Sequence, residues 1–249
     1  MTEPGSPEDP LERLSGGVAS PVEDLLSRPL RPYWLARAAQ HLRDSYAGVP
    51  LAKFPEDLRI YEHLLWAQRP NVVIELGTFM GASALWFRDR LRTLRSYGLI
   101  EEPRVISVDL HTAAARERIA DVDPDWERDI TLLEGDVCDG RLPGRVEGLL
   151  PPGARCLVIE DSAHTYETTR GALEGFARFV AEGGFLVVED GCVDVEAMRL
   201  EEGWPRGVTP AVEDWLRSEP GSAFRMRRDL ELYGVTCHPH GFLQRTGSG

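Results

Sequence analysis

The chain alternates short apolar runs with longer stretches in which apolar residues recur at helical spacing. The short runs are predicted to form strands, and they occupy Val72–Leu76, Val105–Asp109, Ile130–Leu133, Cys156–Ile159 and Phe185–Val188. Two intervening stretches, Ala82–Leu94 and Tyr166–Ala181, are predicted helices, and the second is followed by Gly183 and Gly184, a typical helix exit. Strands that are apolar on both faces and separated by helices predict an α/β fold, with a mostly parallel central sheet covered by helices on both faces.

The two ends of the chain have different patterns. Residues 1–20 are interrupted by proline and glycine and predict a disordered leader. Residues 21–70 contain two amphipathic stretches, Tyr33–Arg43 and Asp57–Ala67, which predict helices that complete a binding pocket for the domain formed by residues 71–249. Near the carboxyl end, the runs Leu230–Thr236 and Gly241–Arg245 predict an antiparallel hairpin that closes the sheet.

Composition narrows the choice of partners. The formal net charge is -13, from 41 acidic against 28 basic residues, so no basic excess exists to neutralise the phosphates of a nucleic acid. No apolar run approaches the ~20 residues that a membrane helix needs, and the first residues lack the apolar core of a secretory signal. The four cysteines are widely separated and contain no CxxC pair, which indicates reduced thiols. We expect a soluble, cytoplasmic protein that acts on a small molecule.

The first predicted strand ends in an acid and leads into a turn that contains two glycines. The turn reads Glu75-Leu-Gly-Thr-Phe-Met-Gly81, and the second strand ends in Asp109. Glycines let the backbone approach a ligand closely, and Asp109 can bind two ribose hydroxyls. The turn lacks the Gly-x-Gly-x-x-Gly of a nicotinamide dehydrogenase, and a carboxylate at Glu75 would repel a pyrophosphate. S-adenosylmethionine (SAM), a cationic nucleoside, fits this pattern.

Every predicted parallel strand brings an acid to the same edge of the sheet. These acids are Glu75, Asp109, Asp136, the pair Glu160 and Asp161, and the pair Glu189 and Asp190. Ligands of parallel sheets bind beyond the carboxyl ends of the strands, so this edge is the predicted functional site. Asp136 is assigned to the adenine amino group, with a solvated turn aspartate as the alternative, and Glu75 to the cationic end of SAM. The candidate cofactor-binding residues are Glu75, Gly77, Thr78, Gly81, Ser83, Asp109 and Asp136.

A second group of acids, Asp161, Glu189 and Asp190, is the candidate metal site. Carboxylates from adjacent strands repel one another unless they are protonated or bridged by a cation. Oxygen ligands favour Mg²⁺, Mn²⁺ or Ca²⁺ over Zn²⁺. Alternatively, Asp190 opens a turn with Gly191 and Glu189 packs against a helix. Strand alternation puts Glu160 and Asp161 on opposite faces, so only one of them can point inward.

Histidines supply the candidate proton acceptor. His164 lies three residues after Asp161, just past a strand end, where an imidazole could act as a general base near neutral pH. Its alternative role is to cap or bridge the start of the next helix. His238 and His240 flank Pro239 and are interpreted as exposed turn residues rather than as metal ligands.

Four parts of the sequence together resemble the cephalosporin hydroxylase and rhamnosyl O-methyltransferase family of class I SAM-dependent enzymes. They are the lead-in Leu51–Tyr61, the cofactor loop Val73–Ala84, the two strand ends Ile159–Glu167 and Val187–Gly191, and the closing segment Gly234–Arg245. The resemblance covers Leu51 to Arg245 and leaves the leader to about residue 45 unmatched. The sequence departs from the family at Ala82, His238 and Phe242, where glycine, asparagine and tyrosine are more usual.

The resemblance implies a Rossmann-like class I methyltransferase fold, Mg²⁺ (or Mn²⁺ or Ca²⁺) at Asp161, Glu189 and Asp190, and a homo-oligomer. It also implies that His164 lies beside the acceptor hydroxyl. We therefore expect a SAM-dependent and divalent-metal-dependent O-methyltransferase of natural-product biosynthesis that acts on a deoxysugar or a vicinal diol, with His164 and Asp161 as catalytic residues. The alternative is a non-catalytic SAM-binding module, which would bind SAM but release no S-adenosylhomocysteine (SAH).

Overall fold

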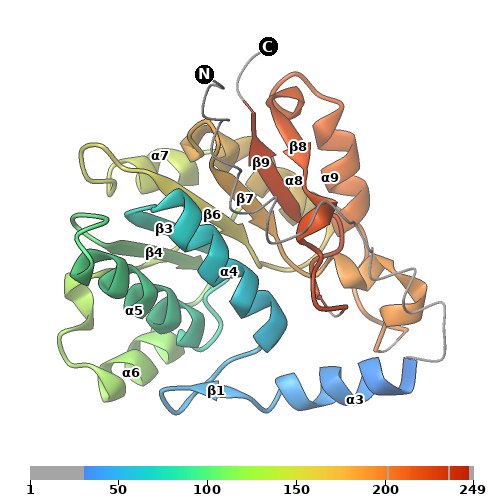
Figure 1. The fold of residues 1–249 in the computed structure, drawn as a ribbon, viewed down its shortest axis with the longest axis horizontal. Coiled ribbons are helices and arrows are strands. Elements are labelled where there is room, and N and C mark those ends of the chain that lie inside the picture. The colour runs from blue at the N-terminus through green and yellow to red at the C-terminus, as the bar shows by residue number, and fades with distance from the viewer. Residues whose placement is uncertain (1–30, 201, 235, 247–249) are drawn as a thin grey trace, which may run out of the picture.

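A seven-stranded sheet in the order β5-β4-β3-β6-β7-β9-β8 forms the centre of the protein (Figure 1). The computed structural model describes residues 31–200, 202–234 and 236–246. The strands of this sheet are β3 Val72–Leu76, β4 Arg104–Asp109, β5 Ile130–Glu134, β6 Cys156–Glu160, β7 Phe185–Val188, β8 Phe224–Met226 and β9 Phe242–Arg245. The first five run parallel, and β9 pairs antiparallel with both β7 and β8. The predicted mixed α/β fold is confirmed.

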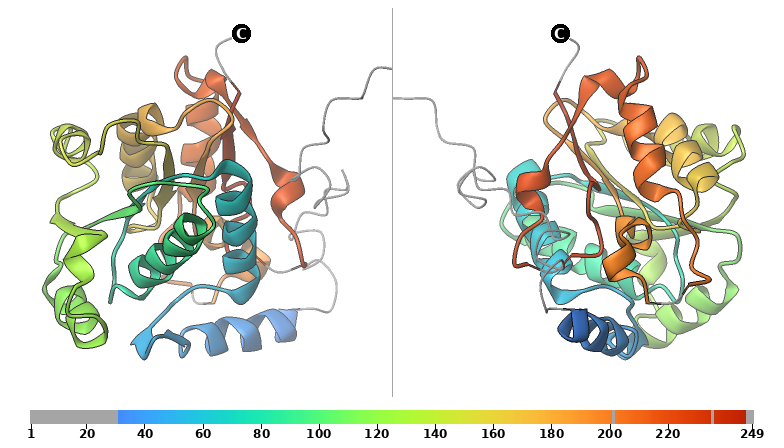
Figure 2. Two further views of the ribbon diagram at one scale, coloured as in Figure 1. Left: turned by 60° about the vertical axis from the view of Figure 1, so that its left-hand side comes forward. Right: turned by 90° about the vertical axis from the view of Figure 1, so that its right-hand side faces the viewer.

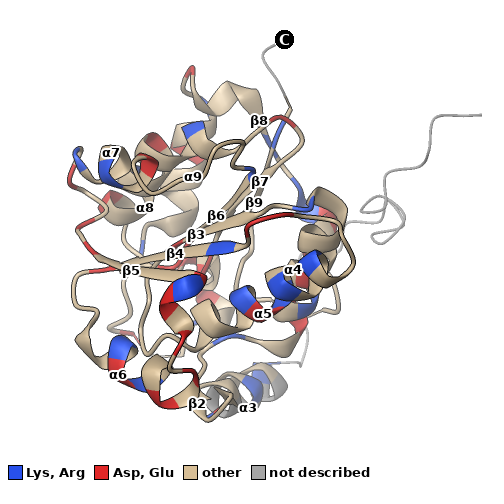
Figure 3. Cartoon of the chain, turned by 90° about the vertical axis from the view of Figure 1, so that its left-hand side faces the viewer, with Lys and Arg blue, Asp and Glu red and all other residues tan. Residues whose placement is uncertain are grey.

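Helices cover both faces of the sheet. They are α3 Arg31–His41, α4 Pro55–Gln68, α5 Ala82–Ser96, α6 Ala113–Val122, α7 Leu142–Glu147, α8 Tyr166–Phe176 and α9 Val208–Leu216. Figure 2 shows α3 lying across one end of the molecule, below the sheet. Figure 3 looks from the β5 edge and shows α4, α5 and α6 on one side of the strands and α7, α8 and α9 on the other.

Alternation along each strand builds the two apolar layers. On β3, Val73 packs with the α4 and α5 side, whereas its neighbours Val72 and Ile74 pack with the α8 and α9 side. Successive strand residues point to opposite faces, so a run that is apolar throughout is buried twice. This is why the five parallel strands could be located from short apolar runs alone.

The order of the strands reverses beside β3, which is paired with β4 on one side and β6 on the other. Backbone hydrogen bonds continue past the strand ends, from Gly77 N to Val108 O at 2.8 Å and from Asp161 N to Leu76 O at 2.7 Å. The carboxyl ends of these three strands therefore lie side by side. Such a reversal is where open parallel sheets bind their ligands.

The closing hairpin differs from the prediction. Its first strand is Phe224–Met226, not Leu230–Thr236. A short 3-10 helix, Arg228–Leu230, ends where the predicted strand would begin, and the described residues after it include a turn. Glu231 draws this segment inward, since its carboxylate accepts a hydrogen bond from His240 N at 3.0 Å and pairs with Arg228. The chain is thus held by a side-chain contact where alternation had predicted a strand.

The predicted amino-terminal helices are found as α3 and α4, and a small hairpin, β1 Ser45–Tyr46 with β2 Val49–Pro50, joins them. The hairpin turn has two residues with positive φ, Ala47 at 52° and Gly48 at 81°. The predicted leader, residues 1–20, lies outside the described residues. Among the described residues, no helix is long and apolar enough to span a membrane.

Candidate active site

One cavity of about 600 Å³ opens at the carboxyl ends of β3, β4, β5, β6 and β7. The candidate residues that line it are Gly77, Thr78, Ser83, Asp109, Asp136, Asp161, His164 and Asp190. Glu75, Gly81 and Glu189 are not among its lining residues. The structure therefore brings most of the sequence-predicted site residues to one cavity, and Glu75 and Glu189 are buried beside it.

Asp109 organises the cofactor loop. Its Oδ2 accepts hydrogen bonds from Thr78 N at 2.9 Å and Phe79 N at 3.2 Å, and its Oδ1 accepts one from His111 N at 3.2 Å. These contacts hold Phe79 in the left-handed region, with φ at 49°. A carboxylate fixed by backbone amides at the cavity wall is oriented before any ligand arrives.

Glu75 lies fully buried behind this loop. Ser107 Oγ donates to its Oε2 at 2.6 Å, whereas no partner is found for Oε1 among the described residues. Burial raises the pKa of Glu75, and the positive charge of Lys53 opposes this effect. A buried carboxylate with a vacant acceptor favours a cationic neighbour.

The two loop glycines are required by packing against protein rather than against a ligand. A Cβ on Gly77 would lie 1.8 Å from the Asp161 carbonyl oxygen, and one on Gly81 would lie 2.6 Å from Ile119 Cδ1. Gly77 has φ at 112° and Gly81 at 87°. Gly77 thus allows the cofactor loop to contact the end of β6 directly, which couples the two halves of the site.

The sequence left two roles open for Asp136, a ligand of the adenine amino group or a solvated turn residue, and the structure is compatible with both. Its Oδ1 accepts a hydrogen bond from Cys138 N at 2.9 Å, as expected for a turn aspartate, and the residue is exposed. It also lines the cavity, beside Gly135 and Val137.

Lys53 forms the centre of the acid cluster and was given no role by the sequence. Its Nζ lies 2.8 Å from Asp161 Oδ2 and 2.7 Å from both oxygens of Glu189. Tyr61 Oη donates to Glu189 Oε1 at 2.5 Å. The signal was present: Lys53 is the only lysine of the chain, because every other of the 28 basic residues is an arginine. A compact ammonium can contact three carboxylate oxygens where a planar guanidinium would not fit.

Burial and neighbouring charges shift the pKa values of Lys53, Asp161 and Glu189. Burial would raise the pKa of Glu189, but Lys53 and His238 hold that pKa below its usual range. Burial and the Glu189 charge raise the pKa of Asp161 well above its usual value, although Lys53 opposes them. Burial would lower the pKa of Lys53, but the nearby carboxylates raise it well above its usual value, so the ammonium is retained. Two carboxylates therefore share one ammonium, and Asp190 adds further negative charge.

Asp161, His164 and Asp190 each offer a ligand atom, and these atoms lie within 4.8 Å of one another. His164 Nε2 is 3.3 Å from Asp190 Oδ2, and its buried Nδ1 has no hydrogen-bond partner among the described residues. Both residues have positive φ, His164 at 56° and Asp190 at 55°. Strained backbone of this kind persists where the surroundings impose it, commonly at functional sites.

The alternative role of His164, capping the next helix, is filled by another residue. Thr165 is the N-cap of α8, and its side chain forms a capping box with Thr168. The choice between Glu160 and Asp161 is also resolved. Glu160 is fully buried and accepts hydrogen bonds from Ser162, whereas Asp161 lines the cavity. Asp161 is the inward carboxylate.

The interpretation of His238 as an exposed turn residue is wrong. His238 is 2% exposed, its Nδ1 accepts a hydrogen bond from Asp190 N at 3.3 Å, and its Nε2 lies 3.7 Å from Glu189 Oε2. The residue turns inward because Asp57 binds the preceding Thr236 side chain and the Cys237 amide at 2.5 and 2.9 Å. His240 is half-buried, 3.4 Å from Glu213. Among the described residues, neither histidine joins a group that could hold a metal.

Solved structures of methyltransferases share this fold. CmcI in its apo form matches with a TM-score of 0.55 and 21% identity, over 82% of this chain and 77% of that chain. The O-methyltransferase from Bacillus cereus in complex with SAH matches with a TM-score of 0.51 and 15% identity, over 86% and 87%. The fold is therefore that of the class I methyltransferases.

Residues 40–246 match the sequence profile of the Rhamnosyl O-methyltransferase/CmcI family, and the chain belongs to that family. It is 26% identical over 206 residues to the rhamnosyl O-methyltransferase of Mycobacterium tuberculosis (strain ATCC 25618 / H37Rv), which covers 82% of this chain and 78% of the relative. The rhamnosyl O-methyltransferase of Mycobacterium leprae is 26% identical over 205 residues, covering 81% and 82%. The protein is accordingly a SAM-dependent O-methyltransferase, and the non-catalytic alternative is set aside.

Proposed function

We propose that this enzyme transfers the methyl group of SAM to a hydroxyl of a small-molecule acceptor with the help of a divalent cation, Mg²⁺ first. The observation that carries the proposal is the pair of carboxylates Asp161 and Asp190 at the wall of the cavity, which have ligand atoms within 4.8 Å of each other and of the His164 ring. A structure of CmcI with Mg and SAM, which matches this chain with a TM-score of 0.54, gives a precedent within the family.

The residues fit a hard cation. Asp161 and Asp190 present carboxylate oxygens to the cavity, and oxygen ligands are those that Mg²⁺ prefers. Asp161, Glu189 and Asp190 set three carboxyl groups against the single ammonium of Lys53, and a divalent cation would favour the ionised form of all three. Glu189 remains in the proposed ligand set as the carboxylate that would exchange contacts with Lys53 for contacts with the cation, since both of its oxygens now lie 2.7 Å from Nζ.

The other half of the cavity is proposed to hold SAM. Asp109 would accept hydrogen bonds from the ribose hydroxyls, and Asp136 from the adenine amino group. The unpartnered Oε1 of Glu75 would stabilise the cationic end, through water or backbone. Gly77, Thr78, Gly81 and Ser83 shape the loop between these acids.

His164 is proposed as the general base. It takes the proton from the acceptor hydroxyl, while the acceptor oxygen forms a bond to the methyl carbon and the bond from carbon to sulfur breaks, leaving neutral SAH. A bound cation supplies positive charge that lowers the pKa of the hydroxyl. Asp190, whose Oδ2 lies 3.3 Å from His164 Nε2, orients the imidazole.

The experiment uses the full chain, SAM and two probe acceptors that both carry adjacent hydroxyls, 4-butylcatechol and methyl α-L-rhamnoside. Release of SAH is followed by mass spectrometry, with MgCl₂ or with excess EDTA, and cofactor binding is followed by calorimetry. We expect turnover with Mg²⁺ and none in EDTA, with SAH binding unchanged between the two. Full turnover in EDTA would show that the metal proposal is wrong. Size-exclusion chromatography with light scattering tests the homo-oligomer that we also propose.

A further inference from the structure

The acceptor side of the cavity is built from a separate apolar cluster. Its buried members come from α3, the first residues before α4, the 3-10 helices Gly191–Asp194 and Glu196–Met198, and the segment before β9: Trp34, Ala38, Phe54, Cys192, Met198 and Cys237. Leu200 and Trp204 pack against this cluster and also line the cavity. Gly77 and Asp109, which follow or end β3 and β4, line the same cavity.

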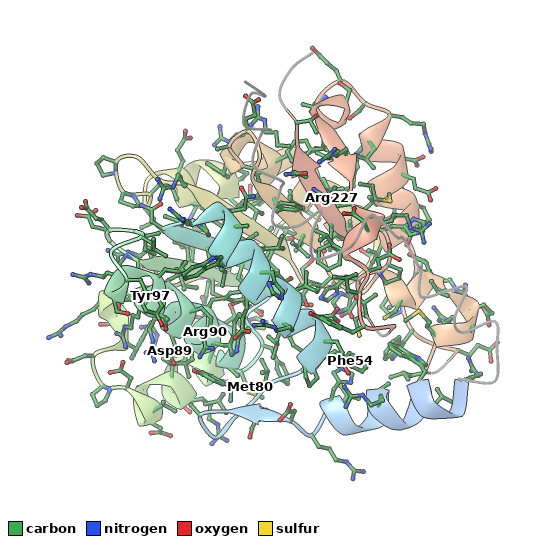
Figure 4. The ribbon with its side chains drawn as sticks, in the orientation of Figure 1. Phe54, Met80, Asp89, Arg90, Tyr97 and Arg227 are labelled. Carbon is green, nitrogen blue, oxygen red and sulfur yellow. The ribbon has the colours of Figure 1, made fainter. Side chains whose placement is uncertain are left out.

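Flat rings dominate this wall. Phe54, which lies between α3 and the first turn of α4 in Figure 4, stacks on Trp34 with ring centroids 5.2 Å apart and on His41 at 4.3 Å. Trp34 Nε1 donates to Met198 O at 2.6 Å, so its polar atom is already satisfied. His41 contacts Ala38 O through Nδ1 at 2.6 Å, and burial lowers its pKa, which keeps the ring neutral. Trp34 and Phe54 are only 2% and 1% exposed, so these rings support the wall from behind. The exposed Leu42 and the half-buried Leu200 and Trp204 supply its apolar surface.

On the acceptor side of the cavity, most of the polar side chains belong to the acid cluster and its neighbours. Among the described lining residues they are concentrated at Lys53, Asp161, His164 and Asp190, together with Ser162 and Thr168 next to them. The remaining acceptor-side wall is formed by carbon and sulfur side chains, apart from His41 and the indoles. A sugar carries hydroxyls around its whole ring, and those facing this wall would lose water without gaining a partner.

We infer that the acceptor is a flat, apolar ring system that carries its reactive hydroxyl beside a second oxygen, an ortho-dihydroxy aromatic compound, rather than a free monosaccharide. Its two oxygens face Asp161 and Asp190, and its ring packs against Trp204 and Leu200. This inference rests on the proposed function, because it takes the acid cluster as the place where the reacting oxygen is held. It replaces the deoxysugar that the sequence suggested with a narrower class.

The test compares the two probes on the full chain loaded with SAH and Mg²⁺. Both 4-butylcatechol and methyl α-L-rhamnoside present adjacent hydroxyls, but only the first has an apolar ring and tail. We expect 4-butylcatechol to bind about tenfold more tightly or better by calorimetry, the ratio expected when an apolar side chain's worth of surface is buried. Equal or tighter binding of the rhamnoside overturns the inference, and so does a failure of both probes to bind.

Substitutions in the apolar wall test whether 4-butylcatechol binds there. Trp204→Ala should weaken 4-butylcatechol binding about tenfold and leave SAH binding unchanged. The matched control is Trp66→Ala, because Trp66 is 52% exposed on α4 and does not line the cavity. If Trp204→Ala loses SAH binding through misfolding, Leu42→Ser replaces it, since Leu42 lines the cavity and is 57% exposed. A variant that retains both SAH binding and full affinity for 4-butylcatechol overturns the inference.

Measuring methyl transfer to the two probes shows which of the two proposals is wrong, the proposed function or the inferred acceptor class. Mg²⁺-dependent methylation of the rhamnoside but not of 4-butylcatechol would overturn the inference and support the proposed function. Tight, Trp204-dependent binding of 4-butylcatechol without methyl transfer under any metal would support the inference about the acceptor and show that the proposed function is wrong.

Discussion

The two halves of the cavity are built in different ways. The proposed cofactor half consists of strand ends and the turns directly after them, so that Glu75, Asp109 and Asp136 each lie at or just after the end of their own strand. The proposed acceptor half is assembled from segments that are far apart in the chain. Trp34 donates to Met198 O across 164 positions, and Asp57 binds Thr236 across 179.

This difference separates what the fold provides from what the individual enzyme adds. The parallel sheet supplies a cofactor site wherever its order reverses. The acceptor wall depends on packing between elements that are not part of the parallel sheet. Asp161, Glu189 and Asp190 stand at the boundary, and Gly77 links the halves because its missing Cβ lets the cofactor loop contact the Asp161 backbone.

The largest expected effect is on the boundary itself. Asp190→Asn keeps the shape of the side chain but removes the charge that faces His164, so we expect turnover to fall about 10³-fold or more, with SAM binding retained. SAH release and calorimetry measure the two quantities. Asp139→Asn is the matched control, since Asp139 pairs with Arg141 outside the cavity. If Asp190→Asn kept wild-type turnover, the carboxylates between the two halves of the cavity would have no role in catalysis, and the comparison would be wrong.

Loss of Lys53 should have the next largest effect. Lys53→Met leaves Asp161 and Glu189 buried without their ammonium, and the free energy of unfolding in EDTA should fall by about 3–5 kcal/mol. Mg²⁺ should then restore stability more in this variant than in the wild type, because cation and ammonium use the same carboxylates. Urea unfolding with EDTA or MgCl₂ measures both.

Lys53→Arg is the control for charge alone. Its guanidinium keeps the charge but not the compact shape, so we expect an intermediate stability. Because Lys53 is the only lysine, an amine-reactive reagent can report on this site with little background beyond the chain terminus. Protection of Lys53 that ends when Mg²⁺ is added would support exchange of Lys53 for the cation, whereas unchanged stability of Lys53→Met in EDTA would argue against the ion pairs.

Gly77→Ala should have a smaller effect on stability, but it should weaken ligand binding in both halves of the cavity. The new Cβ meets the Asp161 carbonyl and φ is 112°, so we expect the unfolding free energy to fall by about 1–3 kcal/mol, with weaker binding of both SAH and Mg²⁺. Gly81→Ala is the comparison, because its Cβ meets the flexible end of Ile119 instead of backbone. Loss of SAH binding alone in Gly77→Ala would mean that the halves are not coupled there.

The sequence predicted those parts of the molecule that are determined by residues close together in the chain. Each parallel strand is a short run that is apolar on both faces, and the acids follow directly after it, so the sheet and the strand-end residues could be placed before the structure. The hairpin before β9 could not be placed in register, because Leu230–Thr236 has the alternation of a strand but is held by Glu231 instead.

The roles of Lys53 and His238 could not be read from the sequence for a different reason. Both are polar residues whose burial depends on partners more than 100 positions away, as the 136 positions between Lys53 and Glu189 show. The neighbours of His238, proline and a second histidine, indicated a turn, but gave no sign that Asp57 would draw this turn into the core. Only the use of a single lysine in an arginine-rich chain marked Lys53 as unusual.

The smallest expected effect belongs to the acceptor wall and concerns pH. Burial lowers the pKa of His41, although Ala38 O and Asp190 oppose this and Arg37 adds to it. The folded protein therefore binds the proton less readily than the unfolded chain, whose imidazole titrates near 6.5. Stability should fall as pH drops from that value toward the lower pKa of the folded state, because only the unfolded state gains the proton there.

His41→Phe keeps a ring that can stack on Phe54 but cannot be protonated, so it should remove this part of the pH dependence. Urea unfolding of both proteins at pH 7.5 and at pH 5.5 measures it, and His111→Phe gives a control at an exposed position that does not line the cavity. If both proteins lose stability equally on acidification, His41 is not buried in the acceptor wall as the structure has it. A smaller loss of stability on acidification in His41→Phe would show that the wall disfavours the protonated form of His41. A wall that disfavours charge in this way suits an apolar acceptor.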